Sequence, residues 1–281
     1  MYKLGINFDE ISDSLDVSLD IVKQLGLKYG ELRTLDGKNF CFWTKEDLEH
    51  VKQTLIEHAV QPVAVASPIF KWYVSNDDPE VEHDSYGFNA RLSDEEKRTV
   101  IKDVLKNAKY LSIPIIRIFS GLGKNKDAVK TFLADPMLAY ALELAEDLDI
   151  YLCVENEPVC HIYTKQQLIE LFAANTHPRM RLWLDVANLI RIGDVVDEEL
   201  LSSVGDAIIY VHVKDYITKA NDVEYVPVGS GEIDYPKTLS LIAQHLPDQT
   251  FVTIETHAPQ DLKQAYSERS IVAMQEMLRR I

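Results

Sequence analysis

Four residues with metal-ligating side chains each lie near the C-terminal end of a short apolar segment in the second half of the chain. They are three carboxylates and one imidazole: Glu155, Asp185, His212 and Glu255. Hard oxygen donors with a single nitrogen donor suit Mn²⁺ or Mg²⁺, and they are also compatible with Co²⁺ or Zn²⁺. Any one of these residues alone is more simply a solvated charge or a core histidine. Their recurrence in corresponding positions predicts a site for one divalent metal ion.

The apolar segments that carry these residues are typical of buried parallel strands. They occupy residues 152–154, 182–184, 209–211 and 252–254. Successive ligands are roughly 27 to 43 residues apart, which leaves room for one helix and a return loop between strands. A parallel α/β barrel collects residues from distant strand ends in this way. An open doubly wound sheet is the competing architecture, but it would scatter the ligands along the edge of a crevice.

The rest of the chain alternates strand and helix patterns in the same order. Further strands are expected at residues 2–7, 27–32, 63–68 and 115–119. Helices are expected at residues 14–25, 45–58, 93–111, 136–147, 164–174, 196–204, 236–246 and 261–280, two of them opened by capping-box patterns at Thr44 and Ser93. Strand and helix alternate without any Gly/Ser-rich linker, which predicts a single α/β domain over residues 1–281, a (β/α)8 TIM barrel.

Composition excludes several classes of function. The net charge is −16, so the chain lacks the cationic balance that a nucleic-acid binder or a protein of anionic membrane surfaces needs. No apolar run reaches the roughly 18 residues of a membrane span, and the first residues turn polar too soon for a signal peptide. The cysteines are odd in number, Cys41, Cys153 and Cys160, and form no Cys-x-x-Cys pair. These features predict a cytoplasmic protein.

The chain also resembles a known family, the xylose isomerase-like TIM barrels, which include the sugar phosphate isomerases and epimerases and the AP endonuclease family 2 enzymes. The motifs that carry the resemblance are 154–158 (Val-Glu-Asn-Glu-Pro), 184–188 (Leu-Asp-Val-Ala-Asn), 212–215 (His-Val-Lys-Asp), 228–235 (Val-Gly-Ser-Gly-Glu-Ile-Asp-Tyr) and 254–257 (Ile-Glu-Thr-His). In the N-terminal half only two weaker matches to the family occur, at residues 30–33 and 117–120. The resemblance implies a single divalent metal held by Glu155, Asp185, His212 and Glu255. It also implies that Glu155 and Glu255 act as catalytic acid and base.

Further residues are predicted to bind substrate. Glu157, Lys214 and His257 each lie two residues beyond one of the four candidate metal ligands. Because side chains alternate along a strand, residues two apart point to the same side of it. Pro158 makes a purely structural role for Glu157 an equal alternative. Aromatic side chains would supply apolar walls for a sugar ring, and the long irregular stretch 69–92 is interpreted as a lid. The complete predicted set is Glu157, Asn188, Lys214, His257, Arg117, Trp72 and Trp43. A weaker hypothesis places a sugar phosphate on the loop 121–126 through Lys124.

These observations predict a metal-dependent isomerase or epimerase for a sugar, a keto-sugar, a sugar phosphate or a polyol, which works by proton transfer through a metal-stabilised enediolate. The alternative is a dehydratase of a keto-sugar or inosose on the same site. A hydrolase of the AP-endonuclease type is disfavoured because the third strand ends in Ser67-Pro68 without a histidine and the charge is strongly negative. A non-catalytic sugar-binding barrel is the third class. The expected partner is a small sugar, without nucleic acid or membrane, and assembly into a homo-oligomer is left open.

Overall fold

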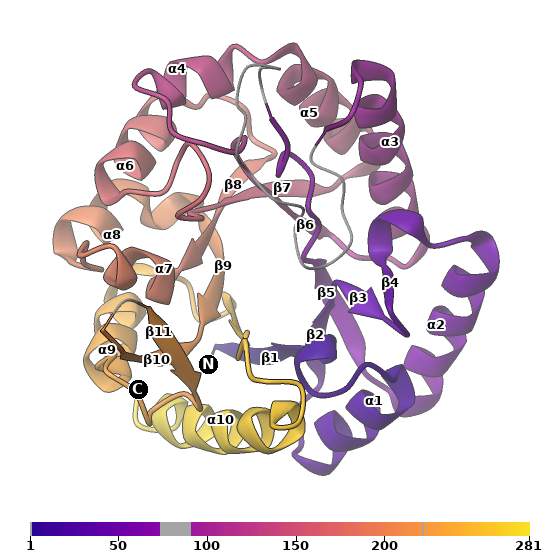
Figure 1. Ribbon diagram of the computed structural model, residues 1–281, viewed down its shortest axis with the longest axis vertical. Coiled ribbons are helices and arrows are strands. Elements are labelled where there is room, and N and C mark those ends of the chain that lie inside the picture. Colours follow the sequence, from indigo (N-terminus) through magenta and orange to yellow (C-terminus); the bar gives the residue numbers. More distant parts are fainter. Residues whose placement is uncertain (1, 74–90, 221) are drawn as a thin grey trace.

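The protein is described here by a computed structural model that covers residues 2–73, 91–220 and 222–281. A closed barrel of eight parallel strands forms its centre, and helices surround the barrel (Figure 1). Around the barrel the strands follow the order β1 (Lys3–Asn7), β12 (Phe251–Ile254), β9 (Ile208–Val213), β8 (Met180–Asp185), β7 (Tyr151–Glu155), β6 (Ile115–Ile118), β5 (Gln61–Val65) and β2 (Tyr29–Leu32). The predicted TIM barrel is therefore confirmed.

Side-chain alternation along the strands divides the core into two parts. Residues on the outward faces pack against the helices, while a separate cluster that includes Val63, Cys153, Trp183 and Tyr210 fills the barrel interior. The rings of Trp183 and Tyr210 pack on each other at an interplanar angle of 35°, with centroids 3.8 Å apart. Because side chains two residues apart share one side of a strand, the residues two positions further on point the same way. The metal-type residues therefore form the next layer, directly above a packed floor.

Apart from α4 and α7, the helices begin and end within a few residues of the predicted positions. They are α1 (Leu15–Gln24), α2 (Lys45–His58), α3 (Asp94–Tyr110), α4 (Ala128–Leu133), α5 (Pro136–Leu148), α6 (Lys165–Ala174), α7 (Val186–Arg191), α8 (Glu198–Val204), α9 (Tyr235–His245) and α10 (Lys263–Leu278), with 3₁₀ turns at Phe8–Glu10, Phe40–Phe42 and Gly205–Ala207. Both predicted capping boxes are present: Thr44 and Ser93 each accept a hydrogen bond from the backbone N–H three residues later. None of the helices in the described ranges is long and apolar enough to cross a membrane.

Two hairpins and two short helices were not predicted. The hairpins are β3–β4 (Thr34–Leu35 with Lys38–Asn39) and β10–β11 (Asp215–Thr218 with Val223–Val226), and the helices are α4 and α7. Strands of two to four residues and helices of six are too short for hydrophobic periodicity to reveal. The stretch interpreted as a lid is only partly described: Ile69 to Tyr73 are mostly buried, and 74–90 lie outside the described residues.

Candidate metal centre

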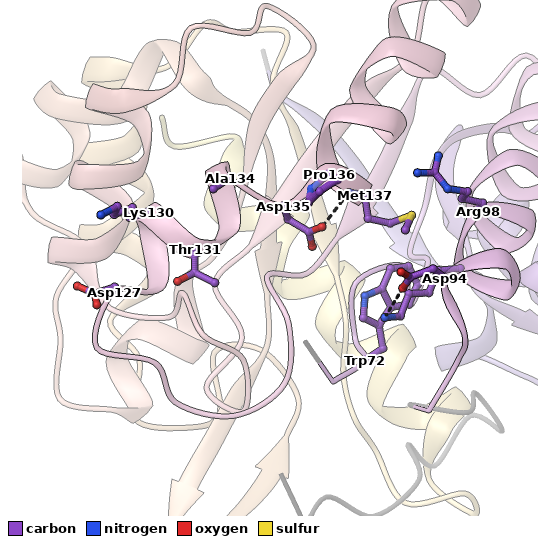
Figure 2. A pocket seen from close by; sticks show the side chains of 11 residues that line it. Trp72, Asp94, Arg98, Asp127, Lys130, Thr131, Ala134, Asp135, Pro136 and Met137 are labelled. Atoms are coloured by element: carbon purple, nitrogen blue, oxygen red, sulfur yellow. Dashed lines mark hydrogen bonds and ion pairs between the residues drawn. The ribbon is translucent and has the colours of Figure 1, made fainter. Parts of the chain in front are cut away.

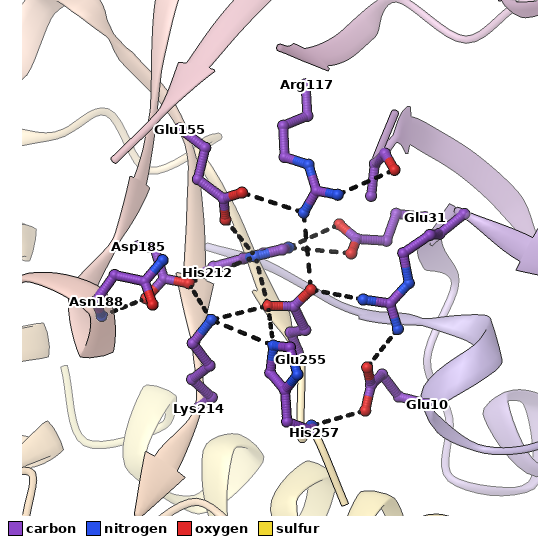
Figure 3. Close-up of polar contacts among 12 residues, drawn as sticks. Glu10, Glu31, Arg117, Glu155, Asp185, Asn188, His212, Lys214, Glu255 and His257 are labelled. Carbon is purple, nitrogen blue, oxygen red and sulfur yellow. Dashed lines mark hydrogen bonds and ion pairs between the residues drawn. The ribbon is translucent and has the colours of Figure 1, made fainter. Parts of the chain in front are cut away.

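The four predicted metal ligands converge at the C-terminal ends of their strands. Glu155 and Asp185 are the last residues of β7 and β8, His212 is the penultimate residue of β9, and Glu255 directly follows β12. One ligand atom from each lies within 4.8 Å of the others, and all four side chains are buried (Figure 3). A shared ion with bonds of about 2–2.6 Å is compatible with this spacing. The structure thus brings together residues that are up to a hundred positions apart in the chain.

Unpaired donor atoms at the centre of the cluster fit a bound cation. Glu155 Oε1 and His212 Nδ1 are buried and make no hydrogen bond, whereas the buried Asp185 Oδ2 is paired with the Lys214 ammonium 2.7 Å away. His212 Nδ1 lies 3.2 Å from Glu155 Oε1 and 3.5 Å from Glu255 Oε2. Buried polar atoms without hydrogen bonds are rare because leaving them unpaired costs roughly 1–3 kcal/mol each. A divalent cation among these atoms would satisfy them, so the donor set fits a metal ion.

The orientation of His212 also suits metal binding. Its Nε2 lies 3.0 Å from both carboxylate oxygens of Glu31 on β2, and Tyr210 Oη donates a hydrogen bond of 2.9 Å to Glu31 Oε2. A proton on Nε2 that is donated to Glu31 leaves the Nδ1 lone pair facing the carboxylates, the arrangement typical of metal-bound histidine. Burial acts to lower the pKa of His212, but the Glu31 and Glu255 carboxylates outweigh it and raise that pKa well above its ordinary value. A bound cation would take the place of the second proton.

Cationic partners keep the two glutamates ionised. Arg117 Nη1 lies 3.1 Å from Glu155 Oε2. Burial acts to raise the pKa of Glu155, but Arg117 and His212 outweigh it and hold the pKa at about 2. Glu255 contacts Arg33 through Oε1 at 2.8 Å and Lys214 through Oε2 at 3.0 Å. Burial acts to raise the pKa of Glu255, but Lys214, His257 and His212 outweigh it and hold the pKa well below the usual range. Both carboxylates can therefore bind a cation and accept a proton.

Asp185 is positioned by backbone hydrogen bonds. Its Oδ1 accepts a 2.8 Å hydrogen bond from the Asn188 backbone N–H and so caps α7. The Asn156 side chain bonds the Asp185 main chain twice, through Nδ2 to the carbonyl and through Oδ1 from the N–H, both at 2.8 Å. Asn188 Nδ2 in turn donates to the Asn156 carbonyl at 3.1 Å. Asn188, a predicted substrate ligand, thus supports the turn that holds Asp185, and its contact with substrate stays a prediction.

Lys214, His257 and Arg117, also predicted to bind substrate, all border the four donors. Lys214 Nζ forms an ion pair with Asp185 Oδ2 at 2.7 Å, and His257 Nε2 lies 2.9 Å from Glu255 Oε2. The His257 ring stacks on Tyr225 of β11 with centroids 4.9 Å apart. The His257 side chain keeps 28% of its surface exposed, so solvent reaches it.

The remaining predicted substrate ligands have different surroundings. Trp43 is buried against Phe40 and donates from Nε1 to the Lys38 carbonyl. Trp72 is buried, packs on Phe70, and lines a cavity of about 630 Å³ between α3, α4 and α5 rather than the metal-type cluster (Figure 2). Glu157 lies beyond the end of β7 and is half-buried. Roles for these three in substrate binding stay predictions.

Lys124, the hypothetical phosphate ligand, donates to the Pro158 carbonyl and lies over the Tyr163 ring.

Five partners of the centre were not singled out as site residues from the sequence: Asp9, Glu10, Glu31, Arg33 and Asn156. The only indication in the sequence was that Glu31 and Arg33 lie at the end of the second predicted strand, within the weak family match at residues 30–33.

Comparisons with known proteins place the chain in a family. The family model of the xylose isomerase-like TIM barrel matches residues 19–281, and the chain belongs to that family. No match is found among curated protein sequences. Among solved structures, the chain resembles the IOLI protein with a bound zinc atom, at a TM-score of 0.75 and 19% identity, covering 98% of this chain and 97% of that one.

Two further structures resemble the chain at similar levels. One is D-allulose 3-epimerase from Methylomonas sp. in complex with D-allulose, with a TM-score of 0.71 and 13% identity, covering 98% of this chain and 97% of the other. The second is the probable 3-DHS dehydratase AsbF from Bacillus anthracis, with a TM-score of 0.71 and 14% identity, covering 97% and 98%. At these identities the likeness shows the fold. The structures that resemble this chain are mostly sugar epimerases and related enzymes.

Proposed function

We propose that the protein is a metal-dependent isomerase or epimerase of a sugar or keto-sugar. The observation that carries the proposal is the convergence of four buried side chains whose ligand atoms lie within 4.8 Å of one another, with Glu155 Oε1 and His212 Nδ1 making no hydrogen bond. Mn²⁺ or Mg²⁺ is the proposed ion, since three of the four donors are carboxylates, and Co²⁺ or Zn²⁺ is compatible. Sugar epimerases among the structural relatives add support.

The two glutamates are suited to move one proton. A divalent cation held by the donors would polarise a substrate carbonyl and acidify the neighbouring C–H bond. Glu155 comes from β7 and Glu255 from the end of β12, with β8 and β9 between them in the barrel, so they approach a substrate from different directions. One carboxylate removes the proton, the C–H electron pair forms a C=C bond, and the π pair of the carbonyl moves onto its oxygen. In an epimerase the other carboxylate returns a proton to the opposite face of the same carbon. In an isomerase the proton goes to the former carbonyl carbon, and the proton of the neighbouring hydroxyl passes to the former carbonyl oxygen, so that the carbonyl moves by one carbon.

The groups around the open side are suited to hold the hydroxyls of a sugar. Lys214 and Arg117 can donate to substrate oxygens while they stay paired with ligand carboxylates. His257, partly exposed and stacked on Tyr225, can donate to or accept from a hydroxyl. We assign the supporting positions to Asn188 and Glu157. The chemistry of a small polyhydroxylated substrate matches this mixture of donors and acceptors.

A dehydratase reaction is the second candidate, and the neighbourhood of Glu255 favours it. His257 Nε2 lies 2.9 Å from Glu255 Oε2 and 3.4 Å from Lys214 Nζ, so an imidazole able to carry a proton stands beside the proposed base. After removal of the proton next to the carbonyl, this group can protonate a β-hydroxyl, which leaves as water. The likeness to a probable dehydratase adds support.

The test combines metal analysis with isotope exchange. Purified protein is subjected to elemental analysis, loaded with Mn²⁺, and incubated in D₂O with a panel of ketoses and keto-sugar acids. The expected result is one divalent ion per chain and deuterium at a single carbon beside the carbonyl of one substrate. An epimer or isomer identifies the first reaction, and an unsaturated product identifies the second. Absence of both exchange and conversion across the panel in metal-loaded protein would overturn the proposal.

A further inference from the structure

Arg33 is the most heavily paired cation among the described residues around the centre. It directly follows β2, and its side chain is only 4% exposed. Its Nε and Nη2 each bond one oxygen of Asp9 at 3.0 Å, and Nη2 also contacts Glu10 Oε1 at 2.5 Å. The other terminal nitrogen of the guanidinium, Nη1, donates a hydrogen bond of 2.8 Å to Glu255 Oε1. One guanidinium thus joins three carboxylates.

The partners of Arg33 are anchored independently of it. Asp9 and Glu10 belong to the 3₁₀ turn that follows β1. The second oxygen of Glu10 accepts hydrogen bonds from Thr256 Oγ1 at 2.7 Å and from the His257 backbone N–H at 2.8 Å. The group Asp9, Glu10, Arg33 and Glu255 therefore spans the ends of three adjacent barrel strands, β2, β1 and β12. We call it the Arg33 cluster. Figure 3 labels two of its members, Glu10 and Glu255.

This anchoring determines which way the Glu255 carboxylate faces. A carboxylate rotates easily about its last bond, because that torsion has a broad, two-fold profile. Arg33 holds Oε1, and Arg117 Nη1 lies 3.7 Å from the same oxygen. Oε2 is consequently the oxygen left facing the centre, 3.5 Å from His212 Nδ1 and 3.0 Å from Lys214 Nζ. The orientation of one proposed metal ligand thus depends on a residue 222 positions away.

We propose that Arg33 is a positioning residue that presents Glu255 Oε2 to the metal ion and to substrate, without itself contacting either. The inference rests on the proposed function, since it gives Glu255 the role of ligand and base. The planar guanidinium is required because it bonds both oxygens of Asp9 while it directs a third N–H at Glu255. A lysine at this position keeps the charge but cannot make these directed bonds together.

The primary test is Arg33→Lys, with Mn²⁺ affinity measured by titration calorimetry and turnover measured as solvent-deuterium exchange. We expect affinity for Mn²⁺ and kcat each to fall about 10- to 100-fold, the range typical when a partner of a metal ligand is removed, with KM changed less than about threefold. Arg179→Met is the matched control: Arg179 pairs with Asp149 on the surface, so wild-type values are expected. Thermal unfolding of each variant checks that the barrel persists.

A double-variant cycle separates positioning of Glu255 from general loss of structure. Glu255→Gln alone should weaken Mn²⁺ binding, and Arg33→Lys added to it should weaken binding by less than about twofold more, because the residue to be positioned is already altered. Additive losses, or wild-type Mn²⁺ affinity in folded Arg33→Lys, would overturn the inference. If wild-type protein binds no divalent ion, the proposed function fails first. If wild-type binds and Glu255→Gln weakens binding, only the Arg33 assignment is at stake.

Discussion

The two halves of the barrel contribute different chemistry to the same centre. The C-terminal half, β7, β8, β9 and β12, supplies all four donor residues. The N-terminal half supplies partners of those donors: Glu31 bonds His212, Arg33 bonds Glu255, and Arg117 pairs with Glu155. Each of these pairs joins one half of the barrel to the other. One half therefore provides the groups able to bind a metal, and the other provides a partner for three of them.

The division follows from the energetics of burial. Three carboxylates placed within a few ångströms repel one another, and burial favours their neutral forms. Asp185 shows this effect, since burial raises its pKa even though Lys214 acts in the opposite direction. Arg117 and His212 provide the opposite effect for Glu155, and Lys214, His257 and His212 provide it for Glu255. The two glutamates are thus ionised because partners from both halves of the barrel are buried with them.

The largest predicted effect comes from the donor half. Glu155→Gln and Glu255→Gln remove the groups proposed to accept and return the proton, and we expect kcat to fall roughly 10³-fold in each, within the range of lost acid–base catalysis. KM should change much less, because the amide keeps the shape of the side chain. Steady-state kinetics with the identified substrate measure both. Unchanged turnover in either variant would refute that glutamate's role.

Removal of the metal ion from the wild-type protein should have a comparable effect. Dialysis against a chelator is expected to abolish exchange of substrate hydrogen with solvent, and Mn²⁺ or Mg²⁺ should restore it. The melting temperature should also drop on chelation and recover on reloading, because an ion that binds only the folded state stabilises it. Activity and melting temperature that both persist after chelation would contradict a metal-dependent centre.

An intermediate effect is predicted for the orienting half. Glu31→Gln keeps a hydrogen-bond acceptor for His212 Nε2 but removes the negative charge, and we expect the Mn²⁺ affinity to fall about 10- to 100-fold. Calorimetry of the apo-protein measures this, and Tyr210→Phe, which removes only the hydroxyl bonded to Glu31, should cost less. A loss as large as that of His212→Ala would erase the distinction between the two halves.

The smallest predicted effect is that of a stability control, which separates loss of folding stability from loss of chemistry in the variants of both halves. Ser93→Ala removes the capping box of α3, away from the centre, and should lower stability by about 1 kcal/mol. The melting temperature should drop by about 2–4 °C in a chain of this size. Metal affinity and turnover should stay at wild-type values. If they fall with stability, then the larger effects above reflect stability and not chemistry.

Sequence reasoning identified the four residues that converge but not their partners, for a physical reason. Glu155, Asp185, His212 and Glu255 each lie at the end of an apolar strand, roughly 27 to 43 residues apart, and a parallel barrel brings these ends to one rim. Their role as metal ligands stays a prediction. Arg33 and Glu31 stand at an equally clear strand end, but nothing local indicates that Arg33 meets Glu255 or that Glu31 meets His212. Those pairings depend on how the barrel closes. Asp9 and Glu10 lie in a 3₁₀ turn that has no periodic signal.

The aromatic predictions show a second limit. Trp43 and Trp72 were chosen by residue type and by their place in loops after strands, and both are buried against other aromatic rings. A tryptophan in a loop can cover a ligand or anchor the loop to the helices, and sequence alone does not separate the two roles. The described contacts of both tryptophans are those of anchors.

The pairing of β1 with β12 has a consequence for the order of events when the protein is made. Lys3 aligns with Phe251 and Ile6 with Ile254, so the first strand of the barrel acquires its second neighbour only after nearly the whole chain has been synthesised. Contacts so distant along the chain close late and slowly. Until Glu255 has been synthesised, the set of four donors is incomplete. A metal ion that needs all four donors would therefore stabilise only chains that extend past Glu255.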